Sequence, residues 1–348
     1  MIINGPAQDS ADTDELAPRY DVVVIGGGVA GLSGALTLAR ARRRIAVIDA
    51  GSPRNAPAAG VHNYLSRDGM SPLALLAQGR AEVRGYGGHL AAGRVTEVTR
   101  DGTGFTVTLA GGRATHARRL LVTTGLVDEL PNVPGLRDRW GRDVVHCPYC
   151  HGWEIRDQAI GVLGTGPMSM HQALLFRQWS ADITYLPHTT PLPAGEQAGQ
   201  LAARGITVVP GEVVGLEVTG DRLTGVRLRD GAVIAVQALA VASRMVARGE
   251  LLAGLGLKPV AHPSGMGEYL PAGPAGRTEV PGLWLAGNVA DISAAVPGSV
   301  ASGALAAAHL NADLVTEETD QAVAARSAGP AGARPVDSPR RRPMYCRS

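Results

Sequence analysis

The sequence predicts an α/β fold with two Rossmann-like βαβ units, each followed by an antiparallel β-meander. Two glycine-rich turns carry this prediction, one starting at Gly26 and the other at Gly164. Each turn follows a short apolar strand and leads into a helical segment. A unit of this kind that occurs twice in one chain is far more specific than either copy alone.

The first unit begins with an apolar strand over residues 20–25, which runs directly into Gly26-Gly27-Gly28-Val29-Ala30-Gly31. A helix over 32–42 and a strand over 44–48 follow, and Asp49 comes directly after that strand. A further helix is expected over 71–85.

The spacing of Gly26, Gly28 and Gly31 is typical of a dinucleotide site, because glycine permits the tight turn and the close approach of backbone to a pyrophosphate. The pyrophosphate would lie at the N-terminus of the following helix, where free N–H groups favour anions. Asp49 would accept hydrogen bonds from a ribose.

Short strands over 94–99, 105–109 and 116–123 predict the first meander, which ends at Thr124-Gly125. The second unit then repeats the first: a strand over 159–163, the turn from Gly164 to Ser169, a helix over 170–179 and a strand over 183–186. Its meander is expected between 207 and 236.

The chain closes with an apolar strand that ends at Gly287-Asn288 and a helix of small residues over 299–316. We expect the polar leader 1–19 and the Ala-, Gly-, Pro- and Arg-rich tail 317–348 to be disordered.

Composition excludes several classes of function. The net charge of +2 argues against nucleic acid as a partner, since a strongly basic surface is the usual footprint. Lys258 is the single lysine, which argues against Schiff-base chemistry. The sequence contains neither an apolar run of roughly 20 residues, as a membrane helix needs, nor a secretory signal. We therefore expect a protein of the cytoplasm that contacts no membrane.

Two of the three cysteines lie in His146-Cys147-Pro148-Tyr149-Cys150-His151-Gly152-Trp153-Glu154, between the two glycine turns. Zinc would need four ligands, and the sequence offers no second cysteine pair beside His146 and His151. Haem attachment normally requires export, and glutaredoxins with this motif are small single domains. We therefore expect no metal here and interpret Cys147 and Cys150 as a redox-active pair.

The two histidines that flank the pair are candidates for acid–base chemistry, because a histidine titrates near neutral pH. His151 is the stronger candidate and His146 the weaker one, while a purely structural role stays open for both. Cys346 lies in the tail, where a free thiol is expected.

Residues 20–317, with these motifs, resemble the low-molecular-weight thioredoxin reductase family of flavoproteins. The resemblance implies a homodimer that binds FAD in a discontinuous domain, residues 20–126 and 247–316. It also implies an inserted NAD(P)-binding-like domain, residues 127–246, that carries the Cys-x-x-Cys. The stretch from Ala286 to Asp291 is similar to the second FAD contact of the family, although Gly287-Asn288 stands where the family has Gly-Asp. The ribitol contact then falls on Asn288 or Asp291.

Within that family, Cys-Pro-Tyr-Cys-His-Gly-Trp-Glu is most similar to the branch with the gliotoxin- and holomycin-type dithiol oxidases. Residues 51–55 and 62–69 are similar to that branch as well. The resemblance implies FAD contacts from Arg54, Asn55 and Gly125. It also implies that Cys150 faces the flavin, while Cys147 exchanges with the substrate. Enzymes of this branch close disulfides in small molecules and pass electrons through FAD to oxygen.

The second glycine turn lacks the groups that select a nicotinamide nucleotide. Gly164 and Gly166 remain candidate contacts, but Ser169 takes the place of the third glycine. The position that matches Asp49 is Pro187, and no arginine occurs between Arg177 and Arg204. His188 is the one candidate for a phosphate contact. This favours reoxidation by oxygen over an NADPH-driven reaction.

Three functions stay open. The first is an FAD-dependent dithiol oxidase that acts on a small molecule, and the second is an NADPH-dependent reductase of a thioredoxin-like protein. The third is a flavin-binding redox sensor without efficient turnover. The sequence does not identify the substrate.

Overall fold

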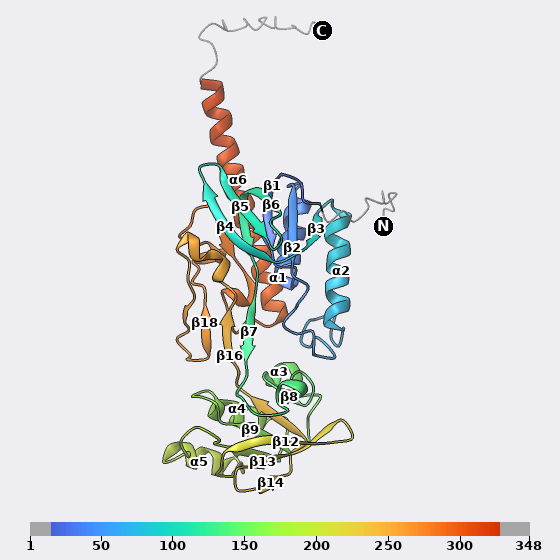
Figure 1. Ribbon diagram of the computed structural model, residues 1–348, viewed down its shortest axis with the longest axis vertical. Helices are drawn as coiled ribbons and strands as arrows, with labels where there is room; N and C mark the ends of the chain where they lie inside the picture. Colours follow the sequence, from blue (N-terminus) through green and yellow to red (C-terminus); the bar gives the residue numbers. More distant parts are fainter. Residues whose placement is uncertain (1–14, 328–348) are drawn as a thin grey trace, which may run out of the picture.

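A computed structural model describes residues 15–327 of the chain. Figure 1 shows two lobes joined by a narrow connection. We call them the large lobe, which holds β1–β6, β19, α1, α2 and α6, and the small lobe, which holds β8–β15 and α3–α5. The mixed α/β fold with two βαβ units and a meander after each is confirmed.

The large lobe is built on one mixed sheet in the order β3-β2-β1-β6-β5-β4, with β19 also paired to β6. Its strands are β1 (Arg19–Ile25), β2 (Ile45–Asp49), β3 (His89–Ala92), β4 (Val95–Asp101), β5 (Gly104–Leu109), β6 (Ala114–Val122) and β19 (Leu283–Leu285). The strands β1, β2, β3, β6 and β19 run parallel, whereas β4 and β5 add an antiparallel edge. Central parallel strands are covered on both faces, so β1 reads as a continuous apolar run.

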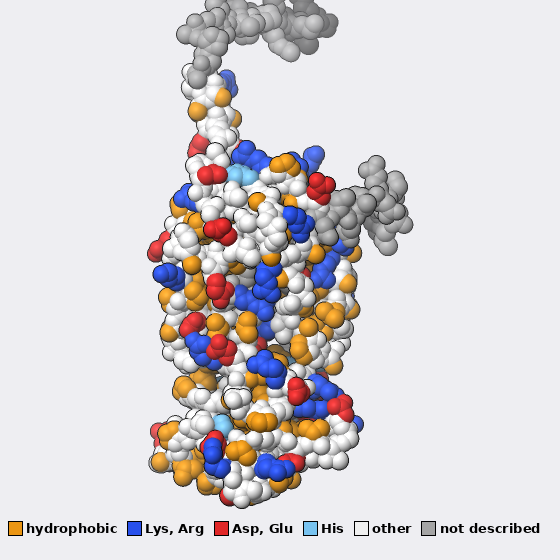
Figure 2. Space-filling view, viewed as in Figure 1, with side chains coloured by type: hydrophobic (Ala, Val, Ile, Leu, Met, Phe, Trp, Pro, Cys, Tyr) orange, Lys and Arg blue, Asp and Glu red, His pale blue; other side chains and the backbone are white. Residues whose placement is uncertain are grey.

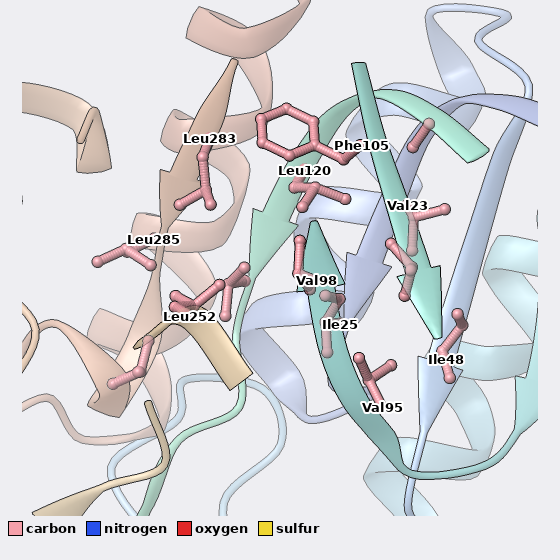
Figure 3. Packing of buried hydrophobic residues seen from close by; sticks show 14 of the residues in the cluster. Val23, Ile25, Ile48, Val95, Val98, Phe105, Leu120, Leu252, Leu283 and Leu285 are labelled. Atoms are coloured by element: carbon pink, nitrogen blue, oxygen red, sulfur yellow. The ribbon is translucent and has the colours of Figure 1, made fainter. Parts of the chain in front are cut away.

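Helices cover one face of this sheet, and an apolar cluster fills the other. The helices of the large lobe are α1 (Val29–Arg40), α2 (Pro72–Gly85) and α6 (Val296–Ser327). Small residues let α1 and α6 approach closely, because a Cβ on Gly303 would collide with the Ala30 backbone. Figure 3 shows the opposite face, where Phe105, Leu120 and Leu285 pack together from three different strands.

The small lobe repeats this plan. Its parallel sheet has the order β11-β10-β9-β15-β8, and its second sheet has the order β12-β13-β14. The strand near residue 207, expected to start the meander, belongs to the parallel sheet instead, where it pairs with β10. The strands are β8 (Val144–Val145), β9 (Ile160–Leu163), β10 (Ile183–Leu186), β11 (Thr207–Val208), β12 (Val213–Thr219), β13 (Arg222–Leu228), β14 (Val233–Ile234) and β15 (Ala238–Val241). The helices are α3 (Pro148–His151), α4 (Ser169–Phe176) and α5 (Glu196–Ala203).

Two antiparallel strands carry the chain between the lobes. They are β7 (Leu126–Glu129), which leads out, and β16 (Arg244–Ala247), which leads back. With β17 (Val260–Ala261) and β18 (Gly267–Tyr269) they form a four-stranded sheet. Short 3-10 helices are η1 (Arg137–Arg139), η2 (Glu250–Leu255), η3 (Pro274–Gly276) and η4 (Gly287–Val289).

The expected start of the tail at residue 317 is wrong. The helix α6 continues to Ser327, and Figure 1 shows it extending past the sheet. Ion pairs explain the first part of this extension, because Glu317 contacts Arg119 at 2.8 Å and Glu318 contacts Arg118 at 2.7 Å. The rest of the expected tail, with Cys346, and most of the expected leader lie outside the described residues.

The surface carries both signs of charge. Figure 2 shows basic and acidic side chains interspersed over the visible face, with no basic stripe there. Among residues 15–327, none of the helices combines the length and apolar character that a membrane span requires.

Candidate active site

A cavity of about 590 Å³ runs from the first glycine turn to the cysteine pair. It brings together most of the residues expected from the sequence to form the site. Those that line it are Gly26, Gly28, Asp49, Arg54, Asn55, Gly125, His146, Cys147, Cys150, His151, Gly287 and Asn288. Gly31, Asp291, Gly164 and Gly166 are not among the lining residues.

The first glycine turn fits the pyrophosphate of a dinucleotide. A Cβ on Gly28 would meet no atom within 4 Å, so this position is open toward the cavity. No side chain caps the start of α1 at Gly28, which leaves the N–H groups of the first helical turn unpaired by a capping residue. Gly31 has a packing role instead, since a Cβ there would collide with the carbonyl oxygen of Gly26.

Asp49 lines the same cavity as the first glycine turn. It ends β2, and its Oδ2 atom lies 3.1 Å from a guanidinium nitrogen of Arg80 on α2. Gly27 must be glycine to let this carboxylate approach, because a Cβ at that position would lie 2.8 Å from the Asp49 side chain. Since each carboxylate oxygen can accept more than one hydrogen bond, Asp49 can still bind a hydroxyl.

A charged network forms one wall of the cavity. Arg54 donates two parallel hydrogen bonds of 2.7 Å to Asp128 and a third of 3.3 Å to Asn288. The Ser243 hydroxyl also donates to Asp128, at 2.7 Å. Burial opposes ionisation of Asp128, but the hydrogen bonds and charge of Arg54 prevail and lower the pKa of that carboxyl. The network therefore connects Arg54 of the large lobe to Asp128 in β7 and to Ser243, the residue directly before β16.

Sequence reasoning missed Asp128 and Ser243. Asp128 lies 74 residues from Arg54 and 115 from Ser243, so no local pattern connects them. The Asn288 side chain is held in place by hydrogen bonds, because its amide nitrogen also donates to the carbonyls of Asp291 and Ala294. The Asp291 carboxylate accepts hydrogen bonds from the amide and the hydroxyl of Ser293, which lines the cavity, although Asp291 itself does not.

The cysteine pair lies at the start of α3, directly after β8. Cys147 and Cys150 form a disulfide with their Cα atoms 5.2 Å apart. The Cys147 sulfur caps the helix by accepting a hydrogen bond of 3.2 Å from the Cys150 amide. Pro148 starts the helix, a position where its missing N–H has no cost. Both sulfur-bearing residues line the cavity that the first glycine turn also lines.

The two flanking histidines differ in their surroundings. His146 Nδ1 lies 3.1 Å from the Val241 carbonyl oxygen and 3.4 Å from the Ser243 amide nitrogen. In His151 both ring nitrogens are buried, and neither has a hydrogen-bond partner within the described chain. Burial lowers the pKa of both imidazoles below 6.5, so both are neutral at pH 7. His151 is therefore free to take up a proton from a group in the cavity.

The second glycine turn has part of its hydrogen-bonding capacity occupied. The fully buried Ser169 hydroxyl accepts hydrogen bonds from the amides of Thr165, at 3.0 Å, and Gly166, at 3.3 Å. His188 Nδ1 accepts a hydrogen bond of 3.1 Å from the Val213 amide, which directs this side chain to the protein backbone. The turn is retained, but these groups are engaged internally.

Comparison with known proteins agrees with this geometry. The family model described as pyridine nucleotide-disulphide oxidoreductase matches residues 20–329. Thioredoxin reductase sirT of Leptosphaeria maculans is 30% identical over 309 residues, which cover 84% of this chain and 93% of that protein. Thioredoxin reductase tcpT of Claviceps purpurea is 28% identical, with 86% and 96% coverage.

Solved structures agree as well. The crystal structure of HlmI is 46% identical, with a TM-score of 0.84 over 93% of this chain and 99% of that one. An oxidoreductase from Agrobacterium tumefaciens is 36% identical, with a TM-score of 0.80 over 86% and 99%. The resemblance stated from the sequence is confirmed, and the chain belongs to the pyridine nucleotide-disulphide oxidoreductase family.

Proposed function

We propose that the protein is an FAD-dependent dithiol oxidase that closes a disulfide within a small molecule and uses oxygen as the final acceptor. The observation that carries this proposal is the contrast between the two glycine turns. The first turn has no side-chain cap and lines the cavity that Cys147 and Cys150 also line. In the second turn, the Ser169 hydroxyl already accepts hydrogen bonds from two backbone amides. Similarity to the dithiol oxidase branch in the motif around the cysteines supports the same reading.

The residues that would hold FAD follow from the cavity. Gly28 and the start of α1 would bind the pyrophosphate, and Asp49 would bind a ribose. Arg54, Asn55, Gly125, Gly287 and Asn288 would line the remainder of the site. When bound, FAD supplies a two-electron acceptor that oxygen can reoxidise.

The cysteine pair carries out the exchange with the substrate. A substrate thiolate attacks the Cys147 sulfur, the bond to Cys150 breaks, and Cys150 leaves as a thiolate. The second substrate thiol gives its proton to the neutral His151 imidazole. The resulting thiolate attacks the substrate sulfur of the mixed disulfide and releases Cys147 as a thiolate. The substrate has then lost two electrons, which the cysteine pair holds.

The overall reaction balances as one dithiol plus oxygen giving one disulfide plus hydrogen peroxide. Its substrate would be small, because the cysteines lie in a cavity between two lobes. A homodimer is proposed on the family resemblance, and a cytoplasmic location on the small number of cysteines.

The second candidate is an NADPH-dependent reductase of a thioredoxin-like protein. Its support is the name of several relatives, including the thioredoxin reductase of Streptomyces coelicolor, 30% identical over 287 residues. Anaerobic titration of the purified flavoprotein with NADPH separates the two candidates. The oxidase proposal expects the visible flavin absorbance to persist under excess NADPH and NADH. Rapid bleaching by NADPH would establish the reductase instead.

A further inference from the structure

The helix that carries the cysteine pair is too short to be stable without contacts from the rest of the protein. α3 spans four residues, Pro148–His151, whereas isolated helices need roughly 12 or more residues to be even marginally stable. The Cys147 sulfur satisfies the Cys150 amide at its start. Toward its end, no backbone amide of the described chain donates to the Tyr149 carbonyl.

The missing partner comes from the other lobe. The side-chain amide of Asn63, in the segment between β2 and α2, donates a hydrogen bond to the Tyr149 carbonyl. These residues lie 86 positions apart in the chain. The neighbouring His62 adds a second contact, with its Nε2 atom 3.4 Å from Glu154 Oε1. In Figure 1 this blue segment lies beside α3, where the two lobes meet.

Asn63 is itself held in place. Its backbone amide donates a hydrogen bond of 2.9 Å to Asp68 Oδ1, and His62 Nδ1 lies 3.5 Å from Asp68 Oδ2. The backbone of Asn63 has a φ of 59°, a conformation that asparagine adopts more readily than most residues. The loop therefore presents a fixed donor to α3.

We propose that Asn63 is a positioning residue for the redox helix, and that His62 assists it through Glu154. From the large lobe, Asn63 holds α3 so that the disulfide faces the cavity formed with the first glycine turn. The inference rests on the proposed function in one respect, that Cys147–Cys150 is the site of thiol exchange. It implies that the pair is presented correctly only while the lobes stay in contact.

Two substitutions remove the donor without straining the loop. Asn63→Gly and Asn63→Asp both tolerate a positive φ, but neither can donate from the side chain at neutral pH. Ser66→Gly is the matched control, since Ser66 has a φ of 70° in the same loop and its side chain has no hydrogen bond to the small lobe among the described residues.

The first measurement is amide hydrogen exchange over residues 147–152 of the oxidised holoprotein. Loss of one hydrogen bond should speed exchange there by about fivefold in both Asn63 variants. Ser66→Gly should match the wild type. Equal exchange in all four proteins would overturn the proposal. This readout needs no substrate and stays valid if the oxidase function proves wrong.

The second measurement separates two steps under anaerobic conditions with dithiothreitol as the dithiol. Alkylation of quenched samples counts the thiols of the pair, and visible absorbance follows the flavin. The Asn63 variants should open the disulfide at a rate within about twofold of the wild type and reduce the flavin about tenfold more slowly, because the pair is misplaced. Flavin reduction at the wild-type rate in both variants would contradict the inference. A wild type that dithiothreitol does not reduce would refute the oxidase function, while the exchange result would still decide the role of Asn63.

Discussion

The Ser169 hydroxyl accepts hydrogen bonds from the Thr165 and Gly166 amides, inside a glycine turn that otherwise has the form of a nucleotide site. A pyrophosphate would have to compete with this hydroxyl for the same donors. The relation is internal to the small lobe and involves a fully buried side chain. It gives a physical reason, beyond the absence of nearby arginines, why this unit would bind a nicotinamide nucleotide weakly.

The first prediction follows from this competition. Ser169→Gly removes the hydroxyl and frees both amides, so the affinity for ADP should rise by about fivefold, as one hydrogen bond of about 1 kcal/mol would give. Isothermal titration of the wild type and the variant measures the change. Identical affinities would show that Ser169 does not limit nucleotide binding.

A second prediction concerns the turn that would hold FAD. Gly28→Ala should fold normally, because a Cβ there meets nothing and the φ of −74° suits alanine. It should nevertheless lose most of its flavin, since the methyl group projects where the pyrophosphate would approach. Flavin content per purified chain is the measurement. Gly85→Ala, equally open but outside the cavity, is the control and should retain full flavin.

Much of this architecture could be predicted because its signals are local. The strands that flank Gly26 and Gly164 and the meander turns need only a few adjacent residues to be recognised. The end of α6 could not be predicted in the same way. Residues beyond Glu317 look polar in isolation, and the ion pairs of Glu317 and Glu318 with Arg118 and Arg119 arise only when the helix packs on the sheet.

The candidate site could likewise be predicted only where its signals are local. The cysteine pair and His151 follow from one motif, and the structure places them on one cavity. Asp128 gave no signal, and Asn63 lies in a stretch noted only for its resemblance to the dithiol oxidase branch. Their contacts with Arg54 and Tyr149 could not be predicted, because these partners are distant in sequence. Tertiary contacts of this kind become visible only once the lobes are placed together.

A third prediction concerns the acid–base role of His151. Burial lowers its pKa below 6.5, so the neutral imidazole is the base, and dithiol oxidation should fall only as the pH drops through that lowered value. His151→Gln should reduce the rate by about a hundredfold and remove this decrease at low pH, the acid limb of the pH–rate profile. His146→Gln should have a much smaller effect, because His146 Nδ1 faces backbone atoms. The pH–rate profiles of the three proteins decide the assignment, and a persistent acid limb in His151→Gln would refute it.

A fourth prediction tests the network around Asp128. Asp128→Asn removes the negative charge that pairs with Arg54 and leaves the partly buried guanidinium without a charged partner. This should lower the free energy of unfolding by about 3 kcal/mol. Chemical denaturation measures the difference. Asp182→Asn, an exposed carboxylate on the small lobe, should change stability by less than about 0.5 kcal/mol. Equal effects would show that the network does not hold the connection together.

A fifth prediction concerns acid stability. Hydrogen bonds from Arg43 and Arg118 lower the pKa of Glu318 from 4.5 to about 2. A carboxylate with a lowered pKa stabilises the fold at pH values above its pKa in the unfolded chain. That contribution is lost as the pH falls from 4.5 to about 2. The gap in melting temperature between the wild type and Glu318→Gln should therefore narrow through this range. A gap that stays constant would show that the α6 ion pairs contribute little.

The most direct test of the account measures oxygen. Purified holoprotein is mixed in air with a small dithiol and no nicotinamide nucleotide, and an oxygen electrode is combined with a peroxide assay. We expect oxygen uptake with one hydrogen peroxide formed per disulfide, and loss of this activity in Cys147→Ser and Cys150→Ser. Turnover that occurs only when NADPH is added would contradict it.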